Sequence, residues 1–530
     1  MGDTETKHGI YKMNRFQRSK IIYFDLLFAI VLLGYQLYVN RGRLLGNDYN
    51  WDLLNYHLIN VTLKQDLALH ASNIQSFFPS TLDRLISPIH TSIPSPFSGL
   101  IMLAPFVFNF IIIKKLFIQR LLEESFRLPN TLTVISLSSS VAISQMNNSM
   151  GDLVLSPLVL AGIAMFLIGV KESDSKVLVL SAIPLGVALS LKWTYLYVQI
   201  SLFLLLIVLI AVRAIKISSL IKWGFINAGI FLLFSLHQFT KLYIGTRNPV
   251  FPFANGLFKS ESYPEINFRD NRFGLRTILD YFETPLKLAR GQEGGTSELL
   301  FQDIRLLILV LSLVLWVIYS MHTLISQKSK EADVLTNLVL FTFFAYVSWG
   351  YLFGISRYFL AIDLLIPLLA LSILAKISRL LINNSLVNVS LILGLAMLLT
   401  STTTSVNWGY DPSRTSHIAF EKAIYPVKVS PKSALLLADM PLGFMSYQIR
   451  SKSDILYLSP AFNEYNLQDQ LQLIDKRVIY SLSYNNNKDF LNEVLLKYSV
   501  QSTSKCQTIK LNFNNGLTPS TVFLCETKSP

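Results

Sequence analysis

The sequence predicts an all-α polytopic membrane protein with a small α/β domain at its C-terminal end. Three observations predict this class. Of the 530 residues, 52% are hydrophobic and only 15% are charged, a composition too apolar for soluble cores alone. About eleven apolar stretches approach the roughly 20 residues that a helix needs to cross a bilayer. After residue 403 the sequence becomes more polar and alternating.

The predicted spans lie within residues 21–403, a transmembrane domain that also contains two long loops. The first span follows a basic tail at residues 1–20 and is expected to stay as an anchor, because arginines follow it where a signal-peptide cleavage site would carry small residues. Long outer loops are expected at 40–97 and 245–303. The spans lie near 21–39, 98–118, 129–146, 152–170, 176–191, 193–212, 223–244, 304–325, 334–353, 358–376 and 386–403.

Positive charge is expected to mark the cytoplasmic side of the membrane. The formal net charge is +13, and cationic residues of membrane proteins gather in short cytoplasmic loops near anionic lipid head groups. With a cytoplasmic N-terminus, the short outer turns hold essentially only Lys192 and Arg357. We therefore predict a multi-pass protein of the inner or plasma membrane, in contact with the lipid bilayer and with no nucleic-acid partner. An odd number of spans makes the C-terminus extracytoplasmic.

Residues 404–530 are predicted to form an extracytoplasmic α/β domain. The chain's two cysteines, Cys506 and Cys525, lie in this domain. An oxidising exterior would let them pair across adjacent strands, and the alternative is two unpaired thiols. Alternating and helical patterns predict strands at 434–438, 455–458, 478–482, 508–513 and 521–525, and helices at 467–474 and 489–498.

The polar loops place any chemistry at the outer face. Every polar loop of substance is predicted to be outside, whereas the cytoplasmic connections are short and basic, which argues against the use of a cytoplasmic nucleotide. The chain also lacks the sequence motifs of P-loop ATPases, dinucleotide-binding folds, zinc proteases and hydrolases with a nucleophile elbow.

The densest polar and aromatic cluster follows the first span, at residues 47–57. With Asp48 as the N-cap of a helix, Asp48, Asp52 and Asn55 would lie on one face at helical spacing. A partly desolvated carboxylate at the membrane boundary can take a proton from an attacking hydroxyl, because burial raises its pKa toward a useful range. The alternative is that Asp48 only caps the helix and Asp52 only solvates it.

Three further charged residues are expected on the same side of the membrane. Asp152 opens the fourth span, where a helix N-terminus favours an anion, so capping alone also explains it. Lys192 and Arg357 break the rule that short outer turns avoid positive charge, and this exception indicates an anionic partner such as a lipid phosphate. The alternative for both cations is snorkelling to lipid head groups.

The architecture and three short motifs resemble the GT-C class of integral-membrane glycosyltransferases. The motifs are Trp51-Asp52-Leu53-Leu54-Asn55-Tyr56-His57, Asn248-Pro249-Val250-Phe251-Pro252 and Ser356-Arg357-Tyr358. Within the class they are most similar to bacterial proteins near glycosyltransferase family 87 and to mannosyl- and aminoarabinose-transferase relatives. The resemblance covers the whole chain in architecture and only these stretches in sequence.

The resemblance implies transfer of a sugar from a polyprenyl-phosphate donor to a hydroxyl of a sugar, lipid or protein acceptor in the cell envelope, with inversion at the anomeric carbon. It implies Asp48 or Asp52 as the general base. An Asp-Glu pair found in some relatives is absent here, so the aligned aspartate and the use of a divalent metal cofactor stay open. The implied substrate-binding residues are Asp152, Lys192, Arg357, Tyr56 and His57.

Two other functions fit a polytopic, basic chain. A transporter or flippase would show broken helices at matching places in two halves and charged residues near the membrane midplane, and neither pattern is present in the sequence. A non-catalytic protein of envelope-polysaccharide assembly would bind polysaccharide through the terminal domain. It would tolerate substitution of Asp48, Asp52 and Arg357.

Overall fold

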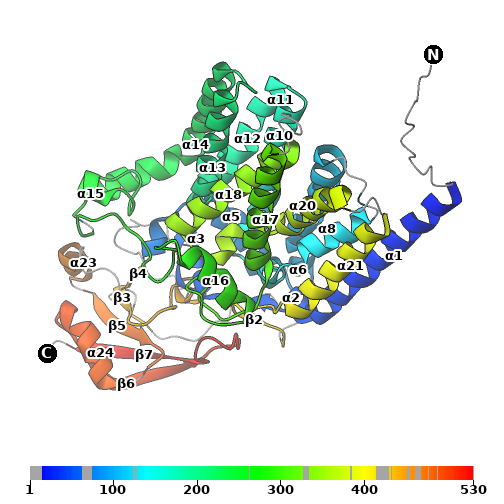
Figure 1. The fold of residues 1–530 in the computed structure, drawn as a ribbon. Helices are drawn as coiled ribbons and strands as arrows, with labels where there is room; N and C mark the ends of the chain where they lie inside the picture. Colours follow the sequence, from blue (N-terminus) through cyan, green and yellow to red (C-terminus); the bar gives the residue numbers. More distant parts are fainter. Residues whose placement is uncertain are drawn as a thin grey trace, which may run out of the picture.

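The computed structural model in Figure 1 is mostly helical, with a strand-rich region at the C-terminal end. Residues 1–14 of the expected N-terminal tail lie outside the described residues. The structure describes residues 15–62, 74–122, 126, 128–261, 263–325, 333–381, 385–413, 420, 429–430, 432–449, 454–459, 467–475, 477–485 and 487–528.

The N-terminal three quarters of the chain form the helical region. The helices are α1 (Arg15–Val39), α2 (Arg41–Leu45), η1 (Leu53–His57), α3 (Leu58–Thr62), η2 (Ile74–Phe77), α5 (Thr81–Ser92), α6 (Phe97–Met102), α7 (Ala104–Ile112), η3 (Ile113–Leu121), α8 (Pro129–Leu137), α9 (Ser140–Ser144), α10 (Asp152–Lys171), α11 (Ser175–Leu180), α12 (Ala182–Leu191), η4 (Trp193–Tyr195), α13 (Leu196–Ala211), α14 (Ile217–Thr246), α15 (Asn255–Phe258), α16 (Asp280–Ala289), α17 (Arg305–Ile325), α18 (Val334–Leu352), η5 (Ser356–Phe359), α19 (Leu360–Asp363), α20 (Ile366–Leu381) and α21 (Ser385–Thr402).

Seven helices within the described residues are long and apolar enough to cross a bilayer, which indicates a multi-pass membrane protein. An eighth is present if Ser356–Asp363 and Ile366–Ile377, which meet at a 44° bend, are counted as one span. The seven are Ile22–Val39, Phe97–Leu121, Asp152–Lys171, Trp193–Ala211, Ile217–Thr246, Arg305–Thr323 and Val334–Leu352.

The remaining expected spans are not among the seven helices. The stretch at 129–146 is interrupted at Ser138 and Ser139, because the Ser139 hydroxyl accepts a hydrogen bond from the backbone N–H of Ala142 and starts a new helix. The stretches at 176–191 and 386–403 contain the shorter apolar helices Ser175–Leu191 and Val389–Thr402. The described structure therefore supports fewer full-length spans than the eleven expected.

The C-terminal region is built on a five-stranded sheet with the strand order β4-β3-β5-β7-β6. Strand β3 runs parallel to β4 and β5, and β7 runs antiparallel to β5 and β6. Cys506 and Cys525 face each other on β6 and β7 and form a disulfide. The elements are β3 (Lys432–Leu437), α22 (Met445–Gln448), β4 (Asp454–Leu458), α23 (Leu467–Ile474), β5 (Val478–Ser483), α24 (Lys488–Leu495), η6 (Leu496–Tyr498), β6 (Gln501–Lys510) and β7 (Thr521–Lys528).

The strand-rich region packs against the segment that follows the first span. A short antiparallel pair joins β1 (Asn47–Asp48) to β2 (Tyr410–Asp411). The ring of Tyr49 stacks on Phe513 with centroids 4.2 Å apart. The backbone N–H of Phe444 donates to the carbonyl of Leu54 at 2.8 Å. These contacts fix the position of η1, which carries several of the expected site residues.

Candidate functional site

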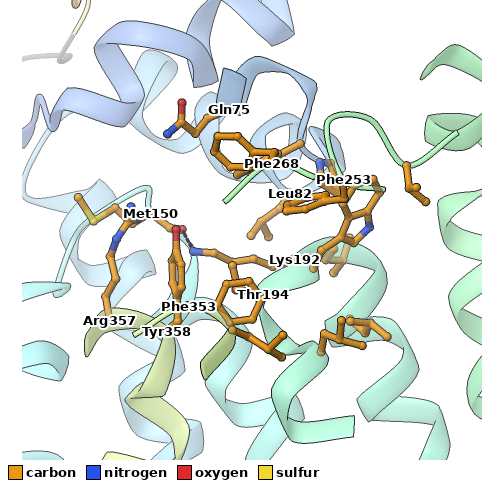
Figure 2. A pocket seen from close by; sticks show the side chains of 18 of the residues that line it. Gln75, Leu82, Met150, Lys192, Thr194, Phe253, Phe268, Phe353, Arg357 and Tyr358 are labelled. Atoms are coloured by element: carbon orange, nitrogen blue, oxygen red, sulfur yellow. Dashed lines mark hydrogen bonds between the residues drawn. The ribbon is translucent and has the colours of Figure 1, made fainter. Parts of the chain in front are cut away.

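A cavity of about 740 Å³ lies where several helix ends meet (Figure 2). The turn before α10, the turn between α12 and α13, the end of α18 and the start of η5 all reach it. The loop segments around η1, η2 and residues 250–269 complete its wall. Four stretches that the sequence placed at one side of the membrane therefore come together around one space.

One wall of the cavity is aromatic and apolar. Phe253 stacks on Phe78 with ring centroids 5.5 Å apart. The centroid of the Phe253 ring also lies 5.9 Å from that of Phe268 and 5.8 Å from that of Trp193. Figure 2 shows Phe253 and Phe268 together with Leu82 on this side of the cavity. Such a surface suits an acyl or prenyl chain, or the apolar face of a sugar ring.

Arg357 holds the two long loops together at the cavity. Its Nη1 lies 3.0 Å from Oδ2 of Asp52, and its Nη2 lies 3.3 Å from Oε1 of Glu298. The Arg357 and Asp52 side chains are 8% and 11% exposed, so water screens their attraction only weakly. The structure thus brings together Asp52 and Arg357, two of the predicted site residues.

Burial alone would raise the pKa of the Asp52 carboxyl, but the opposing effects are stronger. The nearby positive charge of Arg357, the neighbouring His57 imidazole and a hydrogen bond from Tyr56 hold the pKa below its ordinary value. The sequence-based reasoning that burial raises this pKa toward a useful range is therefore wrong for Asp52. Asp52 is an ionised partner of Arg357.

Lys192 is the second cation of the cavity and is also paired. Its Nζ lies 2.5 Å from Oδ1 of Asp152, which is fully buried, and it donates to the carbonyl of Met150 at 2.7 Å. Figure 2 shows Tyr358 between Lys192 and Arg357. The Tyr358 ring lies 5.3 Å from Lys192 Nζ and 5.0 Å from the Arg357 guanidinium carbon. The ring of Tyr358 therefore lies within cation–π distance of both cations on the cavity wall.

Tyr56 and His57 lie at the C-terminal end of η1 and both line the cavity. Burial raises the pKa of the Tyr56 hydroxyl well above its usual value, and the negative charge of Asp52 adds to this effect, so the phenol stays protonated and can donate a hydrogen bond. His57 Nδ1 lies 2.7 Å from Oδ1 of Asp83 on α5. The two residues expected to bind substrate therefore face the cavity.

Asp48 has a different place from the one expected. It lies in β1 rather than at the N-cap of a helix, and Asn50 caps the helix by accepting the backbone N–H of Leu53 at 2.9 Å. The Asp48 carboxylate accepts from the backbone N–H of Ser149 at 2.8 Å and from Asn50. The expectation that Asp48 and Asp52 share one helix face is therefore wrong, because strand pairing with residue 410 fixes Asp48 outside the helix.

Three charged residues of this region were not among those predicted. Glu298 binds Arg357, Asp83 contacts His57, and Arg269 lines the cavity beside Phe268. Glu298 and Arg269 lie in a loop without periodic structure, so no pattern singles them out. Asp83 shares a buried helix face with Ser87 and His90, a run of polar residues at helical spacing that was a usable signal.

The described residues contain no group of three or more His, Cys, Asp or Glu side chains placed to hold a metal ion. In comparisons with known proteins, no protein-family model matches the chain and no curated protein matches it significantly. The geometry of the cavity is therefore the basis for the functional argument.

Proposed function

We propose that the protein is an integral-membrane glycosyltransferase of the GT-C type, which moves a sugar from a polyprenyl-phosphate donor to an acceptor hydroxyl with inversion at the anomeric carbon. The reaction would take place at the outer face of the membrane. The acceptor is a sugar, a lipid or a protein of the cell envelope. The observation that carries the proposal is the joining of an aromatic, apolar wall to two cations, the buried Arg357 and the half-buried Lys192, in one cavity.

The cavity matches the two chemical halves of such a donor. An apolar wall that includes Phe253 accommodates the first units of a prenyl chain. Lys192 and Arg357 suit the phosphate, because buried cations bind phosphate oxygens through charge-assisted hydrogen bonds. Both cations already have carboxylate partners, so an arriving phosphate would compete with Asp152 and Asp52 for them.

The same cations would assist the chemical step. In a direct displacement the acceptor oxygen attacks the anomeric carbon while the bond to the phosphate oxygen breaks. Negative charge develops on the departing phosphate, and Arg357 and Lys192 stabilise it in a site from which water is largely excluded. The hydroxyl of Tyr56, protonated at neutral pH, donates to Asp52, and its oxygen can still accept a hydrogen bond from a sugar hydroxyl. Asp52 keeps the guanidinium in place until the phosphate arrives.

The proposed orientation agrees with the charge distribution and with the disulfide. Basic short loops favour the cytoplasmic side, and a Cys506–Cys525 bridge is typical of an oxidising compartment. The ends of α10, α13, α18 and η5 that meet at the cavity are those that this orientation places outside. An extracytoplasmic strand-rich region would lie beside the cavity, where a carbohydrate acceptor arrives.

The test is consumption of a defined donor. Purified protein in lipid is incubated with a panel of polyprenyl-phosphate sugars, and release of polyprenyl phosphate is measured with and without acceptor glycans. We expect one donor to be consumed and its sugar to appear on the acceptor. A flippase or an assembly protein would return every donor unchanged, and stability of all donors in a panel that covers the common hexoses and pentoses would contradict the proposal.

A further inference from the structure

Displacement at the anomeric carbon needs a group that accepts the proton of the acceptor hydroxyl. The carboxylates first expected for this role are already engaged. Asp52 is paired with Arg357, and the Asp48 carboxylate is buried in hydrogen bonds to Ser149 and Asn50. Neither aspartate is among the residues that line the cavity. A base has to reach the space in which the acceptor binds.

His57 and Asp83 do reach that space. Both line the cavity, and they come from different elements, η1 and α5. Nδ1 of His57 lies 2.7 Å from Oδ1 of Asp83, and the two side chains are 12% and 7% exposed. This contact engages Nδ1 of the imidazole. Nε2 is therefore the ring nitrogen that remains to accept a proton. Among the described residues, no group hydrogen-bonds to this buried Nε2.

From this geometry we infer that His57 is the general base of the transfer and that Asp83 is its positioning residue. The inference rests on the proposed function and changes the assignment of the base within it. The arrangement follows a common logic of acid–base catalysis, in which a carboxylate orients an imidazole through one ring nitrogen and the other nitrogen takes the proton.

The proton and the electron pairs balance in one step. The acceptor O–H transfers its proton to Nε2 of His57, and the oxygen forms a bond to the anomeric carbon. The bond from that carbon to the phosphate oxygen breaks, and its electron pair leaves with the polyprenyl phosphate beside Arg357 and Lys192. The imidazolium then releases its proton to water, which restores neutral His57.

The charges around His57 suit this cycle. Asp83 from α5 and Asp52 from the same segment as His57 are negative, whereas Arg357 from η5 and, farther away, Lys192 are positive. An incoming phosphate adds negative charge to the site. The imidazolium that forms during transfer is therefore favoured by Asp83, by Asp52 and by the departing phosphate. Asp52 contributes through its charge and needs no proton transfer of its own.

The test compares His57→Gln, Asp83→Asn and Asp52→Asn with the wild-type protein, using the donor that the wild type consumes. His237→Gln, on the exposed face of α14, is the matched histidine control. Transfer rates are measured from pH 5 to pH 9, and binding of the product polyprenyl phosphate is measured separately. This second readout shows that each variant is folded and that its phosphate site is intact.

His57→Gln is expected to lower the transfer rate by about 100-fold or more while product binding changes less than about threefold. The pH profile of the His57→Gln rate should differ from that of the wild type, because the variant lacks the group that takes the acceptor proton. Asp83→Asn is expected to displace the pH profile and lower the rate by about tenfold, and His237→Gln should match the wild type.

Three results would overturn the inference. The first is transfer by His57→Gln at a rate near that of the wild type. The second is loss of product binding together with transfer, which would make His57 part of the binding wall only. The third is a pH dependence of the transfer rate that Asp52→Asn abolishes and His57→Gln retains. This result would make Asp52 the base. If the wild type consumes no donor, the proposed function itself fails, and this result is distinct from the other three.

Discussion

The Asp52 carboxylate lies 3.0 Å from the guanidinium of Arg357, so a residue that follows the first span is ion-paired with one that opens the last bent span. Glu298, from the second long loop, binds the same guanidinium at 3.3 Å. Three segments that are distant in the sequence thus meet at one buried cation. In the proposed function, the same guanidinium both stabilises the site and binds the phosphate.

Removal of Arg357 should destabilise the protein more than removal of Asp52. Arg357→Gln leaves two carboxylates without their cation in a largely buried site, a change that typically costs about 3–5 kcal/mol. Asp52→Asn leaves the guanidinium with Glu298 and should cost less. The double variant Asp52→Asn with Arg357→Gln should recover part of the loss. Thermal unfolding in detergent measures all three, and equal losses from both single variants would contradict the buried network.

The Asp52–Arg357 pair should make stability depend on pH in acid. The pKa of Asp52 is lower in the folded protein than the ordinary carboxyl value of about 3.9. The pair therefore contributes fully at pH values above the ordinary value, and its contribution is lost as the pH falls through the lowered folded pKa. The melting temperature of the wild type should exceed that of Asp52→Asn at pH 7, and the gap should narrow below about pH 4. A constant gap down to pH 3 would exclude this linkage.

Substitution of Lys192 should lower the affinity for a polyprenyl phosphate, whereas substitution of an exposed lysine should not. Lys192→Gln removes one of the two cavity cations and leaves Asp152 without its partner, so the affinity for a polyprenyl phosphate should fall by about 10-fold or more. Lys216→Gln, at an exposed position before α14, is the control. Titration of both variants with the same lipid compares them. Equal affinities would show that Lys192 serves only to neutralise Asp152.

Gly443 should be required for docking of the strand-rich region onto η1. A Cβ at this position would overlap the carbonyl oxygen of Asn55. Gly443→Ala should therefore push η1 and its His57 away, which would lower both the melting temperature and the transfer rate. Gly394→Ala on α21 is the control, because a Cβ there meets no atom within 4 Å. If the two alanine variants behave alike, the close contact with Asn55 does not position the site.

The proposed orientation predicts where the two cysteines can be modified. In intact cells a membrane-impermeant maleimide should label neither Cys506 nor Cys525, because they form a disulfide. After treatment with an impermeant reductant, the exposed Cys506 should be labelled from outside, whereas Cys525 is buried. A Cys506→Ser, Cys525→Ser double variant is the background control. Labelling that appears only after cell lysis would place the strand-rich region in the cytoplasm.

The sequence was sufficient for the parts of the fold that depend on local patterns. The expected strands at 434–438, 455–458 and 478–482 lie within β3–β5 apart from one residue, and the helix at 467–474 is α23. The long apolar helices also lie where hydrophobicity placed them. The stretch at 129–146 was expected to be one span, but it forms two short helices. Hydrophobicity alone does not show that the Ser139 side chain caps the start of a new helix.

The two cations of the site were predictable because they are exceptions to the positive-inside rule. Lys192 and Arg357 were singled out because short outer turns avoid cations, and both line the cavity. The pairing of Lys192 with Asp152 and of Arg357 with Asp52 and Glu298 comes from tertiary contacts, which no local pattern encodes. For the same reason the sequence could not separate Asp48, held by Ser149, from Asp52, held by Arg357.

The most direct test of the account is the binding of a short-chain polyprenyl phosphate against the corresponding polyprenol, which has the same chain without the phosphate. Both are titrated into wild-type protein and into Arg357→Gln, whose folding is checked first by its melting curve. The account predicts that the wild type prefers the phosphate by about 10- to 100-fold and that Arg357→Gln loses most of this preference while its affinity for the alcohol is unchanged. Equal affinity of the wild type for phosphate and alcohol, or an unchanged preference in Arg357→Gln, would contradict it.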